Sequence, residues 1–183
     1  GSSMGSDPAF AETARAIGMV MAERGIGLVY GGGRLGLMGV VADAVLGNGR
    51  EAYGVIPQAL IELEVAHTGL TQLHVVTSMH ERKLKMAELS DAFLCLPGGP
   101  GTFEEIFEQS TWALLGIHAK PCGFVNASAY YDLMAQTIQR MADNGFIGQT
   151  YVDMLIYADS TDEALECFAR YAAPPPKRSG AKP

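Results

Sequence analysis

The sequence predicts a single α/β domain: a three-layer, Rossmann-like, doubly wound parallel sheet with helices on both faces. Two observations support this fold class. Short apolar runs alternate with longer segments of helical periodicity along the chain, and two of these runs end in a glycine-rich turn that opens a helix. Such alternation is typical of parallel sheets, because two parallel strands need a long crossover connection, which is usually a helix.

The composition suits one compact domain. The chain has 183 residues, 48% hydrophobic and 18% charged, which is enough apolar material for a full core. No apolar run is long enough to span a membrane, and a net charge of −7 disfavours a nucleic acid as a partner. The three cysteines are far apart and odd in number, which argues against disulfides and a zinc cluster. We therefore expect a cytoplasmic protein that binds neither nucleic acid nor membrane.

Helices and strands are expected to alternate from Pro8 onward. The predicted helices are 8–24, 40–49, 78–89, 103–116, 130–144 and 161–171. The predicted strands are 27–30, 52–56, 73–77, 92–96, 121–125 and 154–158, and residues 58–70 are expected to be irregular or a short helix. Capping boxes are predicted at Ser78-x-x-Glu81 and Ser160-x-x-Glu163.

The two ends of the chain carry separate expectations. The turn Gly1–Pro8 has no strand before it, although a helix docked on a parallel sheet normally leaves from a strand. We favour a missing first strand over the alternative that Gly1-Ser2-Ser3-Met4 is an expression-vector remnant. The domain is expected to span 1–172, and the proline-rich, basic tail 173–183 is expected to be disordered.

The central stretch of the sequence is Leu94–Glu105. An apolar run ends there in Pro97-Gly98-Gly99-Pro100-Gly101, and a helical pattern follows. Glycines let backbone N–H groups approach a ligand closely, and a helix N-terminus offers unpaired N–H groups and about half a positive charge. The pattern therefore predicts a phosphate site, to which Thr102 adds a hydroxyl. The alternative is that Thr102 and Glu105 form a capping box that only starts the helix.

A second glycine turn, Gly31-Gly32-Gly33, follows the first predicted strand. Its spacing to Gly36 fits a dinucleotide fingerprint, which also needs an acidic residue at the end of the next strand. That strand ends in Ile56-Pro57, so we expect no NAD. We interpret Gly31, Gly32 and Gly33 as facing a phosphate or ribose, with close backbone packing as the alternative.

Two cations break a local rule. Arg82 and Lys83 fall near the start of a predicted helix, where the helix dipole disfavours positive charge. Helix starts in a doubly wound sheet lie at the carboxyl edge of the strands, so both side chains could complement a ligand phosphate. The alternative is a solvated basic patch. The four histidines are scattered, and no nucleophile or metal motif is present, so we predict no metal site.

In this order, the motifs closely resemble the "lonely guy" family of cytokinin riboside 5′-monophosphate phosphoribohydrolases. Many bacterial members of that family carry the label "lysine decarboxylase". The resemblance covers the chain from Gly1 to about Tyr171. The chain departs from the family's commonest pattern at two positions, where Pro100 replaces a frequent aromatic residue and Phe103 a frequent leucine. It rests on Pro97-Gly98-Gly99-x-Gly101-Thr102-x-x-Glu105, Gly31-Gly32-Gly33-x-x-Gly36-Leu37-Met38-Gly39, Gly54-Val55-Ile56-Pro57 and Met79-His80-Glu81-Arg82-Lys83.

The resemblance implies hydrolysis of the N-glycosidic bond of a nucleoside 5′-monophosphate, such as an N6-modified adenosine 5′-monophosphate, to a free base and ribose 5-phosphate. It implies that Arg82 and Glu105 are the catalytic pair. It also implies a homodimer with the site near the interface, and a reaction without metal or organic cofactor. The implied substrate-binding residues are Glu64, Lys83, Gly98, Gly99, Pro100, Gly101, Thr102, Phe103, Glu104 and Thr111.

Several other functions stay open from the sequence. The first is a non-catalytic carrier of a nucleotide or of the molybdenum cofactor, since such carriers share this fold. The second is an amino acid decarboxylase, which would need pyridoxal phosphate. The third is a dinucleotide-dependent oxidoreductase, which Ile56-Pro57 disfavours. Among hydrolases, a general purine nucleoside-monophosphate nucleosidase is the alternative.

Overall fold

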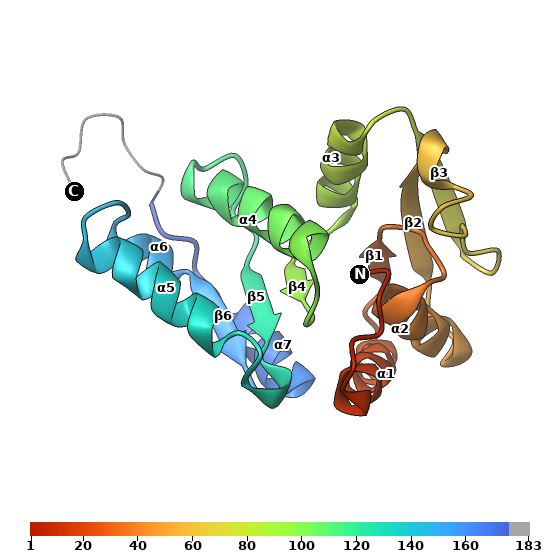
Figure 1. The fold of residues 1–183 in the computed structure, drawn as a ribbon, viewed down its shortest axis with the longest axis horizontal. Helices are drawn as coiled ribbons and strands as arrows, with labels where there is room; N and C mark the ends of the chain where they lie inside the picture. The colour runs from red at the N-terminus through yellow and green to blue at the C-terminus, as the bar shows by residue number, and fades with distance from the viewer. Residues whose placement is uncertain (176–183) are drawn as a thin grey trace. The chain divides into compact units, whose positions relative to one another are not determined.

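The computed structural model describes residues 1–175 and divides the chain into two compact units (Figure 1). The first unit is Gly1–Ser90, and the second begins at Asp91. Each unit contains a three-stranded parallel sheet with helices packed against it, which confirms the predicted α/β class. The extent of one domain over 1–172 stays a prediction. Residues 176–183 of the predicted disordered tail lie outside the described residues.

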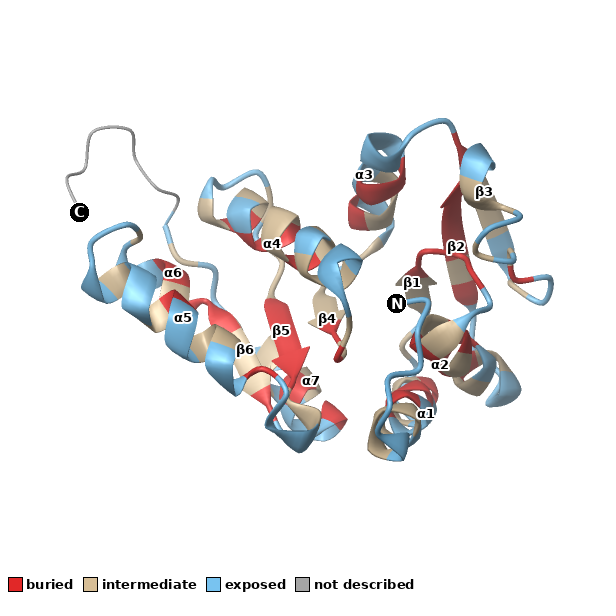
Figure 2. Ribbon diagram, in the orientation of Figure 1, coloured by how far each residue is buried: buried red, intermediate tan, exposed pale blue. Residues whose placement is uncertain are grey.

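The first unit is built on the sheet β1-β2-β3. Helices α2 and α3 contact the sheet, and α1 packs on α2, where a Cβ at Gly18 would lie 2.6 Å from the Cβ of Ala44. Strand β2 is central and largely buried, as Figure 2 shows. The elements are α1 (Pro8–Glu23), β1 (Leu28–Tyr30), α2 (Gly36–Gly47), β2 (Ala52–Pro57), the 3-10 turn η1 (Gln58–Leu60), β3 (Gln72–Val76) and α3 (Met79–Leu89).

The second unit is built on the sheet β4-β5-β6, in which all pairs are again parallel. Helix α4 contacts β4 and β5, α7 contacts β5 and β6, and α6 joins β6 to α5. The elements are β4 (Phe93–Cys95), α4 (Pro100–Leu114), β5 (Cys122–Val125), the 3-10 turn η2 (Ala127–Ala129), α5 (Asp132–Asp143), α6 (Gln149–Asp153), β6 (Leu155–Ala158) and α7 (Thr161–Arg170).

The alternation of side chains along β5 shows that helices cover both faces of the second sheet. Cys122 and Phe124 lie in the core cluster with Ile106 of α4 and Ile138 of α5. The residue between them, Gly123, faces α7, where a Cβ would lie 2.7 Å from Cε1 of Phe168. Because successive side chains of a strand point to opposite faces, this unit has three layers.

The predicted strands agree with the structure to within one residue at either end. Two helices begin earlier than predicted, at Gly36 and Pro100, and both follow glycine turns. Helix α6 was not predicted, because it has five residues and shows no usable periodicity.

The serine caps of α3 and α7 are confirmed. Ser78 Oγ accepts the N–H of Glu81 at 3.1 Å, and Ser160 Oγ accepts the N–H of Glu163 at 3.2 Å. In a capping box the glutamate accepts the N–H of the cap residue itself. Here Glu81 and Glu163 instead accept the N–H of the residue before the serine, Thr77 and Asp159. Glu81 accepts the N–H of Thr77 at 2.8 Å, and this bond lowers the pKa of Glu81.

Candidate functional site

The glycine-rich turn of the second unit leads directly into α4. The helix begins at Pro100 with Gly99 as its N-cap, and among the described residues no side chain caps it. The alternative that Thr102 and Glu105 form a capping box is therefore wrong. Proline suits the first helical position, since its φ is already helical and its missing N–H needs no partner there. Thr102 consequently lies inside the first turn, and Glu105 lies in the second turn rather than the first.

The backbone of this turn is open at two of its three glycines. A Cβ at Gly99 or Gly101 would have no described atom within 4 Å, whereas a Cβ at Gly98 would overlap the Oγ1 of Thr102. Gly98 is thus explained by close packing, and Gly99 and Gly101 leave free space beside the helix start. Of the first N–H groups of α4, Pro100 has none and that of Thr102 donates to Gly99 O at 3.0 Å, which leaves the N–H of Gly101 for an anion.

Two adjacent tyrosines that the sequence analysis missed hold this turn from the carboxyl end of β5. Tyr130 Oη donates to the carbonyl of Gly98 at 2.7 Å, and Tyr131 Oη donates to the carbonyl of Leu96. Tyr131 is fully buried, and its ring packs edge-on against Phe103 and Phe124. These two bonds to backbone carbonyls fix the turn in place.

We expect Tyr131→Phe to loosen the turn without disturbing the core. The variant keeps the ring and loses the bond to Leu96, so stability should fall by about 1 kcal/mol, measured by urea denaturation. Substrate affinity should fall with it. Tyr130→Phe is the matched control for the exposed bond to Gly98, and it should cost less stability. Equal stability of Tyr131→Phe and wild type would contradict this role.

The other predicted residues of α4 divide into two groups. Phe103 packs against Tyr131 and Phe107, with ring centroids 5.7 and 6.2 Å apart, so it belongs to the core. Glu104 and Thr111 are exposed, and Glu105 is half-buried. Thr111 lies roughly 14 Å along the helix axis from Thr102. Within one unit these two residues cannot hold the same phosphate.

In the first unit, Arg82 is held at the start of α3. Its Nη2 donates to Glu64 Oε2 at 3.0 Å and to the carbonyl of Gly31 at 2.8 Å, and its Nη1 lies 3.4 Å from Glu64 Oε1. The guanidinium and the carboxylate thus meet through two pairs of atoms, which fixes the plane of the guanidinium. Arg82 is 4% exposed, so the alternative of a solvated patch is wrong for it.

Lys83 is also buried, which excludes the solvated alternative there too. Arg82 Nε has no hydrogen-bond partner within residues 1–175. A buried guanidinium N–H without an acceptor carries a desolvation cost, which a ligand oxygen could offset.

Close packing accounts for the glycines of the turn after β1. A Cβ at Gly31 would overlap Nη2 of Arg82, and one at Gly33 would lie 3.0 Å from the carbonyl oxygen of Glu64. Gly32 has a φ of +78°, which favours glycine. Close packing is therefore sufficient to explain glycine at these positions. That they also face a phosphate or ribose stays a prediction.

Helix α2, which follows this turn, has its first N–H groups already engaged. Leu37 N–H donates to Ser3 O and Met38 N–H donates to Gly1 O, both at 3.2 Å. The two turns also differ in the space beside them, since a Cβ at Gly99 or Gly101 before and at the start of α4 would have no described atom within 4 Å.

We expect Gly31→Ala to displace Arg82. The added Cβ would occupy the place of the guanidinium, so the Arg82–Glu64 pair must shift, at a cost of about 1–3 kcal/mol in stability. Gly47→Ala is the matched control: it lies in α2, and its Cβ would have no described atom within 4 Å. Thermal unfolding of the two variants measures the difference. Equal melting temperatures would show that the contact with Arg82 does not constrain position 31.

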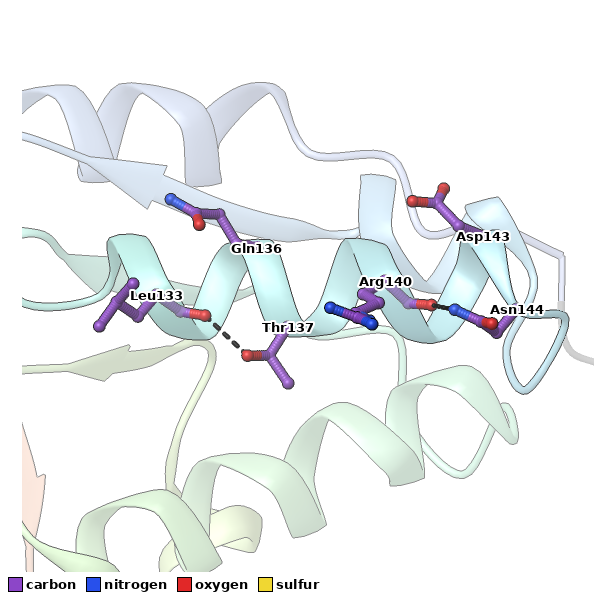
Figure 3. Close-up of a pocket in the computed structure, with 6 residues that line it drawn as sticks. All are labelled: Leu133, Gln136, Thr137, Arg140, Asp143 and Asn144. Carbon is purple, nitrogen blue, oxygen red and sulfur yellow. Dashed lines mark hydrogen bonds between the residues drawn. The ribbon is translucent and has the colours of Figure 1, made fainter.

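An open groove on the second unit is a separate feature (Figure 3). Its polar groups bond within the same helix: Thr137 Oγ1 donates to Leu133 O at 2.8 Å and Asn144 Nδ2 to Arg140 O at 2.7 Å. None of its residues was predicted to bind substrate, and we do not assign it to the site. Its lining residues come from α5 and from the C-cap Asn144, namely Leu133, Gln136, Thr137, Arg140, Asp143 and Asn144.

None of the helices in residues 1–175 is both long and apolar enough to cross a membrane. In the same part of the chain, no three His, Cys, Asp or Glu side chains are grouped so that they could hold a metal ion.

Comparison with known proteins decides the family. Residues 38–168 match the family model described as "Possible lysine decarboxylase". A cytokinin riboside 5′-monophosphate phosphoribohydrolase of Oryza sativa subsp. japonica is 44% identical over 93% of this chain and 71% of its own length. A protein of the same name from Arabidopsis thaliana is 42% identical over 93% of this chain and 79% of its own length.

The chain belongs to the lonely guy family. This confirms the resemblance drawn from its glycine turns and from the Met79–Lys83 motif. The same chain thus matches both a family model described as "Possible lysine decarboxylase" and relatives named as phosphoribohydrolases.

Solved structures confirm the Rossmann-like fold of the family. The molybdenum cofactor binding protein from the phototrophic bacterium Rippkaea orientalis aligns with a TM-score of 0.70 at 18% identity, over 91% of this chain and 90% of that chain. A molybdenum cofactor carrier protein from Chlamydomonas reinhardtii aligns with a TM-score of 0.64 at 15% identity, over 90% of this chain and 88% of that chain. At these identities the likeness concerns the fold alone.

Proposed function

We propose that this protein hydrolyses the N-glycosidic bond of N6-modified adenosine 5′-monophosphates and releases the free base, a cytokinin, with ribose 5-phosphate. The observation that carries the proposal is the open glycine backbone at the start of α4, followed one turn later by Glu105. From Pro100 to Glu105 the helix rises about 7.5 Å, which is similar in scale to a ribose 5-phosphate. A phosphate at the helix start thus leaves the glycosidic bond near a carboxylate.

In this proposal, Glu105 acts at the sugar. Breaking the bond between C1′ and the base builds positive charge on the ribose, and a nearby carboxylate stabilises that charge. Water adds to C1′ and passes one proton to the carboxylate. The base leaves with the electron pair of the broken C1′–N bond and takes up a proton from solvent, so one water is consumed for each bond broken. Losing one positioned acid or base costs about 10²–10⁴-fold in rate.

Arg82 is the second member of the proposed catalytic pair. Its guanidinium is already oriented by the hydrogen bonds to Glu64 and to the carbonyl of Gly31. Its Nε is a buried donor that lacks an acceptor among the described residues. Arginine suits a phosphate or a ribose hydroxyl, since it presents several donors in a rigid plane. We propose that Arg82 and Lys83 supply the positive charge that the substrate's phosphate requires in a chain with a net charge of −7.

The runner-up is a non-catalytic carrier of the molybdenum cofactor. The fold of such carriers supports it, but relatives named as phosphoribohydrolases reach 44% identity, against 15–18% for the carrier structures. The hydrolase is therefore the better supported function.

Chromatographic detection of free base tests the proposal. We expect base release from isopentenyladenosine 5′-monophosphate and, at a lower rate, from AMP. The nucleosides without phosphate should react poorly, because they lack the group that the glycine turn holds. Release from every purine monophosphate at similar rates would indicate a general nucleosidase. Binding without any release would favour a carrier.

We also propose a homodimer with the site near the interface. Large apolar side chains of the second unit are exposed to solvent, among them Leu133 at 76% and Phe146 at 82%, which is typical of a surface that binds a partner. Thr111 is exposed on α4 and lies far from Thr102, so it fits a contact near such an interface better than a contact with the phosphate. Sedimentation of the purified protein would measure its oligomeric state.

A cytoplasmic location completes the proposal. The three cysteines are free, and burial raises the pKa of Cys95 and of Cys122 to about 12, so both stay protonated and unreactive. Free thiols are typical of proteins kept in a reducing compartment.

A further inference from the structure

The loop that carries Glu64 is unusually well fixed for an irregular segment. It lies between η1 and β3, and its backbone is bonded to the glycine turn after β1. His67 N–H donates to the carbonyl of Gly32 at 2.9 Å, and Arg34 N–H donates to Val65 O at 2.9 Å. An isolated bridge between Gly33 and Ala66 lies between these two bonds.

The side chain of His67 fastens the same loop to helix α2. Its Nε2 lies 3.0 Å from Asp43 Oδ1, and its Nδ1 accepts the N–H of Gly69 at 3.0 Å. Because Nδ1 accepts a backbone proton, the ring proton is on Nε2 and is donated to Asp43. The imidazole is 6% exposed, although Asp43 itself is 61% exposed. Both ring nitrogens are therefore used to hold the loop, and neither is available for substrate.

The backbone next to Glu64 is strained. Val65 has a φ of +50°, which is rare for a β-branched residue and persists only where neighbouring contacts impose it. The contacts that impose it are the bonds of Arg34 and of His67 on either side. Without them, the loop should relax and carry Glu64 away from the guanidinium of Arg82.

We propose that His67 and Asp43 are positioning residues for the catalytic site, acting through Glu64 on Arg82. The chain of contacts runs from Asp43 to His67, through the loop to Glu64, and from there to Arg82. The proposal rests on the proposed function, because it assigns a role in the same reaction. Neither residue follows from the motifs by which the family is recognised.

The test compares three substitutions of His67 with wild type. His67→Ala removes both ring bonds, His67→Gln keeps a donor for Asp43, and His67→Asn keeps an acceptor for Gly69. We expect His67→Ala to lower kcat for base release by roughly 10- to 100-fold with little change in KM, since small displacements of a catalytic group are costly. His67→Gln should recover much of this loss, and Asp43→Asn, which keeps an acceptor, should resemble wild type more than Asp43→Ala does.

A second comparison separates positioning from general destabilisation. In a Glu64→Gln background, His67→Ala should cause little further loss of kcat, because the link through Glu64 is already weakened. If His67→Ala lowered kcat by the same factor in the wild-type background and in the Glu64→Gln background, the proposal would be overturned. The matched controls are His74→Gln on β3 and Glu51→Gln at the surface, which should leave kcat unchanged.

Hydrogen exchange tests, independently of catalysis, whether His67 holds the loop that carries Glu64. The amides of Ala66 and His67 are bonded to Ile61 O and Gly32 O, and they should exchange faster in His67→Ala than in wild type. Amides of α1 should not change. If wild type releases no base but the loop amides still exchange faster in His67→Ala, the proposed function fails while the role of His67 in holding the loop survives. If these amides exchange equally fast in both proteins, that role of His67 is refuted.

Discussion

Replacing Glu105 by glutamine is expected to abolish base release almost completely while AMP still binds. The amide has nearly the shape of the carboxylate, but it carries no charge to stabilise an oxocarbenium ion and takes no proton from water. A loss of about 10²–10⁴-fold in kcat is expected. The glycine turn is unchanged in this variant, so Kd for AMP, measured by calorimetry, should stay within a few-fold of wild type.

Glu166→Gln is the matched control for the loss of one carboxylate in the same unit. Glu166 lies on α7 and is paired, at 3.5 Å, with Arg170 on the surface. It should turn over like wild type. Normal turnover by Glu105→Gln would remove Glu105 from the mechanism and leave the glycine turn as a binding site alone.

Replacing Arg82 by methionine is expected to reduce both activity and stability. Methionine fills much of the same volume, but it leaves the carboxylate of Glu64 without its partner and the carbonyl of Gly31 without a donor. Breaking a buried ion pair by removing one partner costs about 3 kcal/mol. Urea denaturation measures the loss of stability, and the chromatographic assay measures the loss of base release, which should exceed 10²-fold.

A double variant separates the two effects. Arg82→Met with Glu64→Leu removes both charges, so much of the lost stability should return. Activity should not return, because the guanidinium is still absent. Recovery of base release in the double variant would show that Arg82 matters only for folding. Arg82→Lys should recover little activity, since a lysine cannot reproduce the two-atom contact with Glu64.

Short apolar runs in the sequence predicted the strands well, and β5 shows why. Its four residues are all buried, so an unbroken apolar run marks it in the sequence. Helices α2 and α4 begin earlier than the helical periodicity indicates, because each helix starts within its glycine turn. Gly39 and Gly101 are helical: the former packs against the carbonyl of Arg34, and the latter stands in open space.

The site was only partly predictable, because its decisive contacts are distant in sequence. The position of Arg82 at a helix start was read from its motif, but its burial depends on Glu64 in an irregular loop and on the carbonyl of Gly31. Tyr131 gave no signal of its own, since its role depends on where the carboxyl ends of β4 and β5 meet.

The parallel pairing of every described strand also has a kinetic consequence. A parallel neighbour can be reached only across a full connecting segment, so no strand here can pair with the next through a tight turn. Topologies of this kind cross a high entropic barrier and fold slowly, in the range of milliseconds to seconds. The strands of Gly1–Ser90 pair among themselves, so this half can begin to assemble while the ribosome is still synthesising the remainder. Slower translation at reduced temperature should accordingly raise the yield of native protein.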